Sequence, residues 1–305
     1  MYERINRIMN NNEHFKSGFV AVVGRPNVGK STMINALIGD KIAIVSDKAQ
    51  TTRNRIICVY TDEEKQIVFM DTPGVHKPKH KLGEFMVDAA IASLKETEAV
   101  LFVVAGNEKR GPGDDFIIEQ LRKVKVPVFL VVNKIDTLKK DELIAAIASY
   151  GDFDFAGVIP ISAKDKENLP ELLKVLGEYL PEGPQYFPED MITDQPERLI
   201  ISDIVREKIL LATRDEIPHA IAVDVDEMKT RPDGTTYIRA TIYCERDSQK
   251  GIIIGNKGAL LRKIGAEARV DIERLLATKV YLDLWVKVKK DWRNKSGMLS
   301  ELGYK

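Results

Sequence analysis

The sequence predicts an open, doubly wound α/β domain with a mostly parallel sheet, followed by a small α+β domain. Apolar runs alternate with helical stretches over the first 180 residues. These runs are nearly continuous in Val, Ile, Leu and Phe, which is typical of parallel strands buried on both faces. A proline-rich segment then precedes a different rhythm. The chain length of 305 residues also fits two domains.

Each element follows from its own pattern. The strands expected in the first domain are 19–23, 66–70, 99–104, 126–132 and 157–161. The helices expected between and after them are 31–38, 82–96, 114–123, 140–150 and 169–180. We expect the first domain to span 1–181 and a linker to span 182–197. The second domain, 198–305, is expected to contain a helix (199–213), strands 220–225 and 237–243, a glycine-punctuated helical stretch (248–276) and a last strand (280–288).

Composition narrows the class of protein. The chain is 44% hydrophobic and 30% charged, with 46 basic and 46 acidic residues, as in an ordinary soluble globular protein. No apolar stretch approaches the roughly 20 residues that span a bilayer, and the polar N-terminus lacks a signal-peptide core. Cys58 and Cys244 are far apart in strand-like runs, which indicates buried thiols in a reducing cytoplasm.

The first candidate site follows the first expected strand. Residues 24–31 match G-x-x-x-x-G-K-[ST] between a strand and a helix, a loop that wraps phosphates with its backbone N–H groups. Lys30 is expected to reach the β- and γ-phosphates, and Ser31 to ligate Mg²⁺. A chance match in a turn is the alternative. The loop residues of the predicted nucleotide site are Gly24, Arg25, Pro26, Asn27, Val28, Gly29, Lys30, Ser31 and Thr32.

A second motif ends the strand 66–70. Asp71 can hold Mg²⁺ through water, and the Gly74 N–H can bond the γ-phosphate because glycine permits close approach. Taken alone, Asp71 could instead cap a helix. Upstream of this Asp71–Gly74 motif, Thr51 and Thr52 are two candidates for a threonine that closes over Mg²⁺. The alternative for this threonine segment is an exposed polar loop. The motif adds Asp71, Thr72, Pro73, Gly74 and Val75 to the predicted nucleotide site.

Two further motifs end the last two strands of the first domain. Asp136 can accept two hydrogen bonds from the N1–H and amine of guanine, whereas adenine would leave it unpaired. Backbone N–H groups of 162–164 can meet the guanine O6. These motifs add Asn133, Lys134, Asp136, Ser162, Ala163 and Lys164. Asn133 alone could be a turn residue, but four ordered motifs at strand ends, where open α/β sheets bind ligands, predict a P-loop GTPase domain for GTP and GDP.

Together, these motifs resemble the Era branch of translation-associated GTPases. The resemblance implies that Thr52 is the metal-binding threonine and that Ser31, Thr52 and Asp71 hold Mg²⁺, Asp71 through water. It also implies that Asn27 helps to bind a K⁺ ion that assists the transition state. Val75 stands where Ras-like GTPases have a water-orienting glutamine, and valine cannot hydrogen-bond water. The predicted catalytic residues are Lys30, Thr52, Gly74 and Asn27.

The second domain carries a Gly255-Asn256-Lys257-Gly258 loop between two helices. A G-x-x-G loop of this kind clamps about four single-stranded nucleotides in KH domains, although a helix break with two glycines is a common alternative. Basic residues surround the loop, and Trp292 in the basic C-terminal stretch suggests base stacking. Trp285, on an alternating strand, is expected in the core. The predicted RNA-binding residues are Arg246, Lys250, Gly255, Asn256, Lys257, Gly258, Arg262 and Lys263.

Charge distribution supports this prediction. Residues 1–180 hold 25 basic and 25 acidic residues, 181–236 hold 6 and 13, and 237–305 hold 15 and 8. The neutral total therefore hides a basic C-terminal part, which contains the G-x-x-G loop. The order of elements is that of a type II KH domain, and the pattern over 198–305 again resembles Era, so that the resemblance covers all but about the first 15 residues.

The sequence thus predicts a GTP-hydrolysing switch whose KH domain binds single-stranded RNA. The resemblance implies that this RNA is the 3′ end of 16S rRNA. By resemblance, the chain acts in assembly of the small (30S) ribosomal subunit, linked to the cell cycle, and is a cytoplasmic monomer with weak peripheral association with the inner membrane. Two rivals remain: a nucleotide-controlled binding module with incidental hydrolysis, and a membrane-associated cell-cycle GTPase whose basic end touches anionic lipid.

Overall fold

The computed structural model describes residues 14–40, 42–44, 52–75, 80–213 and 217–304. The chain forms two compact units, and the main division falls between Asp194 and Gln195. Each unit has its own hydrophobic core. No helix among the described residues is long and apolar enough to cross a membrane.

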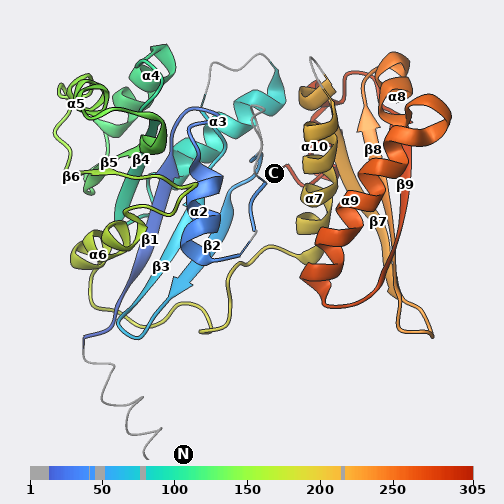
Figure 1. The fold of residues 1–305 in the computed structure, drawn as a ribbon, viewed down its shortest axis with the longest axis horizontal. Coiled ribbons are helices and arrows are strands. Elements are labelled where there is room, and N and C mark those ends of the chain that lie inside the picture. The colour runs from blue at the N-terminus through green and yellow to red at the C-terminus, as the bar shows by residue number, and fades with distance from the viewer. Residues whose placement is uncertain (1–13, 41, 45–51, 76–79, 214–216, 305) are drawn as a thin grey trace, which may run out of the picture. The chain divides into compact units, whose positions relative to one another are not determined.

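The first unit contains a six-stranded sheet in the order β2-β3-β1-β4-β5-β6 (Figure 1). Its strands are β1 (Lys16–Val23), β2 (Ile56–Thr61), β3 (Lys65–Asp71), β4 (Ala99–Ala105), β5 (Val128–Asn133) and β6 (Gly157–Pro160). Its helices are α2 (Lys30–Ile38), α3 (Lys81–Ser93), α4 (Pro112–Leu121), α5 (Lys140–Ala148) and α6 (Leu169–Tyr179). All pairings are parallel except that of β2 with β3.

Alternate residues of the strands feed two cores. Val20 and Val22 of β1 pack in the core that α2 and α6 cover, whereas Ala21 and Val23 pack in the core that α3 and α4 cover. Because both faces of the sheet are buried, apolar residues occupy consecutive positions of the central strands, as in 128–132 of β5. This arrangement confirms the doubly wound, mostly parallel sheet.

β2 is the strand that the sequence pattern left out. It forms an antiparallel hairpin with β3 across a tight turn. The Asp62 side chain accepts hydrogen bonds from the backbone N–H groups of Glu64 and Lys65, each at 2.9 Å, and so closes the turn. β2 lies at an edge of the sheet and is followed directly by β3. The strand–helix alternation that marks the other strands therefore does not mark β2.

The segment 182–197, which was predicted as a linker, runs along the first unit for much of its length. The Ser17 hydroxyl donates to the Pro184 carbonyl at 2.7 Å. The buried Gln66 side chain contacts the backbone of Tyr186 and Phe187, and Thr193 donates to the Ile57 carbonyl at 2.7 Å. These contacts tie residues up to Thr193 to β1, β3 and β2.

The second unit has the element order of a type II KH domain. Its elements are α7 (Glu197–Ala212), β7 (Ala222–Thr230), β8 (Thr236–Cys244), α8 (Asp247–Ile254), α9 (Ala259–Leu276), β9 (Val280–Val288) and α10 (Ser296–Glu301). The sheet order is β7-β8-β9, with β7–β8 antiparallel and β8–β9 parallel. Ile201 and Ile264, from α7 and α9, are fully buried in its core beside Ile238 of β8.

The burial of the two cysteines and the two tryptophans tests three predictions from the sequence. Cys58 and Cys244 are buried free thiols, as expected. The expectation for Trp285 is wrong, since its side chain is 54% exposed on β9. The stacking role suggested for Trp292 is also wrong, because its ring is fully buried and its Nε1 donates to the Ala220 carbonyl at 3.0 Å.

Candidate functional site

The phosphate loop follows β1 and closes at the start of α2. Asn27 and Gly29 have left-handed φ values of 65° and 99°. A side chain at Gly24 would place its Cβ 2.3 Å from the Val103 carbonyl oxygen, and one at Gly29 would clash with Asn133. Glycine is therefore needed at both positions for the loop to lie against β4 and β5.

Lys30 lies inside this loop. Its side chain is buried, and Nζ donates to the carbonyls of Gly24 and Arg25 at 3.0 and 2.9 Å. Burial lowers the pKa of Lys30 to about 8, although the nearby Asp71 carboxylate opposes that shift. A buried ammonium held by carbonyls alone would gain from an anionic partner, such as a phosphate.

Three oxygen-bearing side chains meet beside Lys30. Asp71 Oδ2 accepts from the hydroxyls of Ser31 and Thr52 at 3.0 Å each, and the two hydroxyls lie 3.0 Å apart. Asp71 Oδ1 is buried and has no hydrogen-bond partner among the described residues. Burial raises the pKa of the Asp71 carboxyl, and Lys30 and the two hydroxyls oppose the shift. Thr51, the rival to Thr52, lies outside the described residues.

The segment after Asp71 packs tightly against the phosphate loop. The Thr72 hydroxyl donates to the Val22 carbonyl at 2.7 Å, and the Val75 N–H donates to the Gly24 carbonyl at 3.2 Å. A Cβ at Gly74 would lie 2.8 Å from Pro26 backbone atoms. Pro73 is buried, and the Val75 side chain is only 4% exposed, in the core that contains Val23 and Met70.

Asn133 joins the base-side loops to the phosphate loop. Its Nδ2 donates to the Val28 carbonyl at 2.8 Å, and its Oδ1 accepts from the Ala163 N–H at 3.0 Å. The side chain is 2% exposed, so both hydrogen bonds are shielded from solvent. The sequence analysis placed Asn133 in the site but did not predict these two hydrogen bonds. The position of Asn133 at the end of a buried strand was the only feature of the sequence that pointed to them.

Asp136 remains accessible beside Asn133. Its carboxylate is exposed and accepts from the buried Ser162 hydroxyl at 2.9 Å. Lys134 has φ 69°, and its Nζ lies 3.4 Å from Glu108 Oε1. Lys164 is exposed on the same loop as Ser162. The structure thus brings the residues predicted to bind phosphate, metal and base to the carboxyl ends of β1, β3, β5 and β6.

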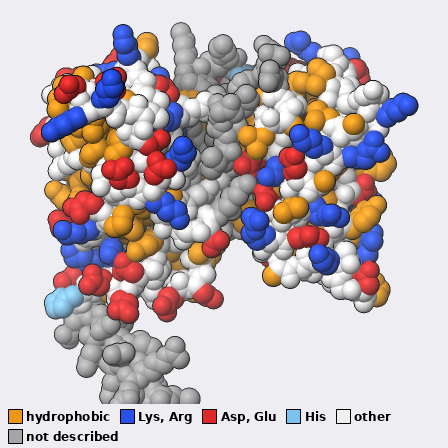
Figure 2. Space-filling view, viewed as in Figure 1, with side chains coloured by type: hydrophobic (Ala, Val, Ile, Leu, Met, Phe, Trp, Pro, Cys, Tyr) orange, Lys and Arg blue, Asp and Glu red, His pale blue; other side chains and the backbone are white. Residues whose placement is uncertain are grey.

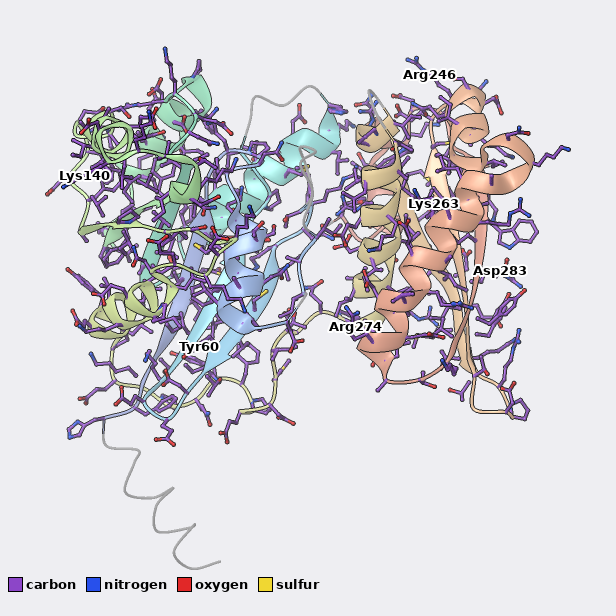
Figure 3. All side chains as sticks on the ribbon, in the orientation of Figure 1. Tyr60, Lys140, Arg246, Lys263, Arg274 and Asp283 are labelled. Carbon is purple, nitrogen blue, oxygen red and sulfur yellow. The ribbon has the colours of Figure 1, made fainter. Side chains whose placement is uncertain are left out.

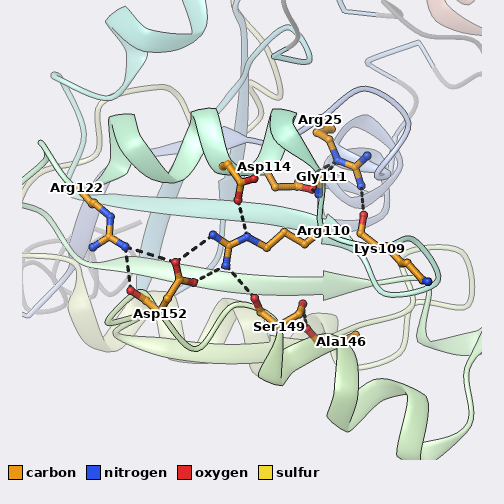
Figure 4. A network of polar contacts seen from close by, with 10 residues as sticks. Arg25, Lys109, Arg110, Gly111, Asp114, Arg122, Ala146, Ser149 and Asp152 are labelled. Atoms are coloured by element: carbon orange, nitrogen blue, oxygen red, sulfur yellow. Dashed lines mark hydrogen bonds and ion pairs between the residues drawn. The ribbon is translucent and has the colours of Figure 1, made fainter.

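Arg25 differs from the other loop residues, because its guanidinium turns to α4. Nε donates to Asp114 at 2.9 Å, and Nη2 donates to the Lys109 carbonyl at 3.3 Å (Figure 4). The same Nη2 lies 3.2 Å from Glu108 Oε2. Asp114 is fully buried and also accepts from the Gly111 N–H at 2.9 Å. Arg25 therefore fastens the loop to α4, an anchor that sequence reasoning missed; an acidic residue three positions after Gly111 was the available signal.

A second arginine organises the same region. Arg110 bonds the carboxylates of Asp115 and Asp152 and donates to the Ser149 carbonyl at 2.8 Å. Arg122 reaches the Asp152 carbonyl at 3.0 Å. These contacts join both ends of α4 to the residues that follow α5.

The G-x-x-G loop of the second unit connects α8 and α9. Gly255, Lys257 and Gly258 all have positive φ, at 72°, 50° and 77°. A Cβ at Gly255 would lie 2.8 Å from Leu260, whereas one at Gly258 would meet no atom within 4 Å. The Gly258 backbone therefore faces open space, where a phosphate can approach it.

A groove of about 500 Å³ runs from this loop between α9 and β9. Lys257, Arg262 and Arg269 supply positive charge along the loop and α9, and the β9 residues Leu282 and Leu284 supply apolar surface. In the view of Figure 2, Lys and Arg side chains lie among hydrophobic ones over the α9 face of this unit. Sequence reasoning missed the β9 lining, because strand alternation does not show which edge borders a groove.

The other predicted RNA-binding residues lie on α8, α9 and the G-x-x-G loop outside the groove lining. Arg246 is exposed at the start of α8, and Lys263 points from α9 toward Glu267 at 3.9 Å (Figure 3). Lys250 on α8 is partly buried, and Asn256 is exposed within the loop. None of these residues, nor Gly255, lines the groove.

Together, the two units define a GTPase that carries a type II KH domain. Residues 19–134 match the family described as 50S ribosome-binding GTPase, and residues 216–293 match the KH domain family. The chain is 42% identical to Era in a crystal structure with MgGDPNP and nucleotides 1506–1542 of 16S ribosomal RNA, with a TM-score of 0.93. It is also 42% identical to a point variant of Era from Aquifex aeolicus bound to GDP and AlF4⁻, with a TM-score of 0.92.

Both similarities cover 95% of this chain and 99% of the other. The chain therefore belongs to the Era family of GTPases. The predicted P-loop GTPase fold, the KH domain and the hydrolysis of GTP to GDP and phosphate are confirmed by this relationship.

Proposed function

We propose that this GTPase binds the single-stranded 3′ end of 16S rRNA in the groove between α9 and β9 and acts in assembly of the small ribosomal subunit. The supporting observation is the groove itself, in which Lys257, Arg262 and Arg269 face an apolar strand beside the open Gly258 backbone. Single-stranded RNA is recognised by this combination of a backbone clamp and an apolar surface for bases. The Era relative was crystallised with a 16S fragment that ends at nucleotide 1542.

The metal site of this function is the Ser31–Thr52–Asp71 cluster. Hydroxyl and carboxylate oxygens are the ligands that Mg²⁺ prefers, and the unpartnered, buried Asp71 Oδ1 fits a nearby water or cation. The hydroxyls of Ser31 and Thr52 would bind the ion directly, and Asp71 would hold it through water. Mg²⁺ would neutralise charge that develops on the β- and γ-phosphates.

The remaining residues position GTP and stabilise charge. Lys30 Nζ would exchange its two backbone carbonyls for phosphate oxygens, and the Gly74 N–H would bond the γ-phosphate. The Val75 side chain is buried and apolar, so the attacking water must be placed by backbone groups of the loops. Asn27 is exposed on the loop, where its amide oxygen can contribute to a K⁺ site that adds positive charge.

Guanine selection would rest on Asp136. Its exposed carboxylate, already oriented by the Ser162 hydroxyl at 2.9 Å, can accept from N1–H and the exocyclic amine. The Ser162 and Ala163 N–H groups donate to the Glu167 carbonyl and to Asn133, so the Lys164 N–H of this loop is the donor that would meet the guanine O6.

In this role the protein would act in the cytoplasm as a monomer, with weak peripheral association with the inner membrane. The test of RNA recognition is Gly258→Asp, in which a carboxylate stands in the path of the phosphates. We expect loss of binding to a labelled 16S 3′-end RNA, measured by fluorescence anisotropy, with basal GTP hydrolysis unchanged.

Gly303→Asp is the matched control, because Gly303 is exposed in the same unit and also has a left-handed φ, of 83°. RNA affinity that survives in Gly258→Asp would sink the assignment of the groove.

A further inference from the structure

The face of the KH sheet opposite α9 carries an unusual set of side chains. On β9, Tyr281 and Trp285 are each 54% exposed. Across the sheet, Lys229, Tyr237 and Tyr281 lie in register, as do Arg239 and Asp283. Since alternate strand residues share a face, these side chains form one surface with Trp285. Figure 3 shows Asp283 on the side of the sheet away from Lys263 and Arg274 of α9.

This aromatic surface is ordered by its own contacts. The rings of Tyr237 and Tyr281 are stacked, with centroids 5.9 Å apart and planes at 15°. The Arg231 guanidinium lies over both rings, 5.0 and 4.8 Å from their centroids. Asp283 accepts from the Tyr237 hydroxyl at 2.9 Å and from the Trp285 indole N–H at 3.0 Å. Side chains held in this way lose little conformational freedom when they bind a partner.

The surface is continuous with the proposed RNA groove. Tyr281 lines the groove between α9 and β9 and also stacks in the aromatic surface, so it stands at the rim between the two. Trp285 lies four residues further along the same edge strand, about 13 Å away at the rise of an extended strand. Exposed aromatic rings beside arginines are the elements with which proteins stack single-stranded bases.

The charged residues of this face determine where the phosphate backbone of an RNA strand could lie. Arg231, Lys229 and Arg239 cluster around Tyr237. On β7, burial and then the neighbouring Asp226 carboxylate raise the pKa of the Asp224 carboxyl. Asp226, at the β7 bulge, accepts from the Thr241 hydroxyl at 2.6 Å. A phosphate backbone is therefore favoured near Lys229 and Arg231, at the Tyr281 end of this face, and disfavoured toward Asp224, which lies in register with Trp285 across the sheet.

We propose that single-stranded RNA continues from the groove over the rim at Tyr281 and stacks bases on Tyr281 and Trp285. This inference rests on the proposed function, because it adds a second contact for the same RNA strand. It predicts that affinity increases with RNA length beyond the four or so nucleotides that a G-x-x-G groove holds.

Tryptophan fluorescence offers a direct test, because the chain has two tryptophans and Trp292 is fully buried. The intact protein is titrated with an RNA of about four nucleotides from the 16S 3′ end and with one of about three times that length from the same end. We expect the longer RNA to quench Trp285 and to bind about tenfold more tightly than the shorter one, as stacking of a base or two provides.

Trp285→Ala should remove this gain in affinity and leave the short RNA unaffected, whereas Trp285→Phe should retain most of it. Leu211→Ala is the matched control, because Leu211 is also 54% exposed in the KH unit but lies on α7. Equal affinities for the two lengths, an unquenched Trp285, or quenching by anionic vesicles with none by RNA would each overturn the inference.

Gly258→Asp separates the two proposals. If this variant binds the short RNA normally, or if the intact protein binds neither RNA, the proposed function fails and the inference fails with it. If Gly258→Asp abolishes short-RNA binding and Trp285→Ala has no effect on long RNA, only the inference fails.

Discussion

Replacement of Asn133 by alanine tests the idea that one buried amide joins the phosphate loop to the base-reading loop. The change leaves the Val28 carbonyl and the Ala163 N–H without their partner, and both lie in a region where Asn133 is 2% exposed. A buried backbone group left unsatisfied costs roughly 1–3 kcal/mol, so the two together lower the free energy of unfolding by about 2–6 kcal/mol. Water that enters the space left by the amide moves the loss toward the lower value.

The assay is equilibrium unfolding in urea without nucleotide, followed by a probe of the first unit, together with titration of a fluorescent GDP analogue. Asn133→Ala should lower both stability and GDP affinity. Asn107→Ala, at an exposed asparagine after β4, serves as the control and should change neither. A loss below about 0.5 kcal/mol, the size of an ordinary surface substitution, would refute the reasoning.

Three further predictions concern the same site. Asp136→Asn should shift preference from guanine toward xanthine nucleotides, because a hydrogen-bond acceptor becomes a donor, whereas the control Asp165→Asn should leave the preference unchanged. Competition binding with GTP and XTP measures this preference. Unchanged GTP affinity in Asp136→Asn would refute the base-reading role. Gly24→Ala should abolish GDP binding in calorimetry, since its Cβ would lie 2.3 Å from the Val103 carbonyl oxygen; normal binding would show that the loop can move away from β4. Exchange of K⁺ for Na⁺ should slow single-turnover GTP hydrolysis, and equal rates would remove the ion-binding role from Asn27.

Most of the fold was predictable because local pattern and tertiary environment agree. The parallel strands are buried on both faces, so their sequences are continuously apolar, and helices fill the intervals between them. β2 was missed because its pairing is antiparallel, with a turn that depends on the Asp62 side chain rather than on glycine or proline.

The two tryptophans show where pattern alone is insufficient. Trp285 sits on an alternating strand, but alternation does not say which face of a strand is covered, and its ring is exposed. Trp292 lies among lysines and arginines in the sequence, yet the chain folds its ring beneath the Ala220 carbonyl. Basic neighbours in sequence therefore do not establish that an aromatic ring is free to stack.

Residue types identified the nucleotide motifs, whereas the contacts between motifs required the structure. Nothing in the spacing of Arg25 and Asp114 shows that they form a buried pair, because the contact crosses from the phosphate loop to another helix. The same holds for Asn133, whose two partners lie 105 and 30 residues away in sequence.

The central claim, that the KH groove of this GTPase binds the 3′ end of 16S rRNA, is tested most directly by crosslinking in cells with sequencing of the bound RNA. The intact protein should yield reads concentrated at the 3′ end of 16S rRNA, and Gly258→Asp should lose them while Gly303→Asp retains them. Reads from other RNAs, or an unchanged pattern in Gly258→Asp, would contradict the account.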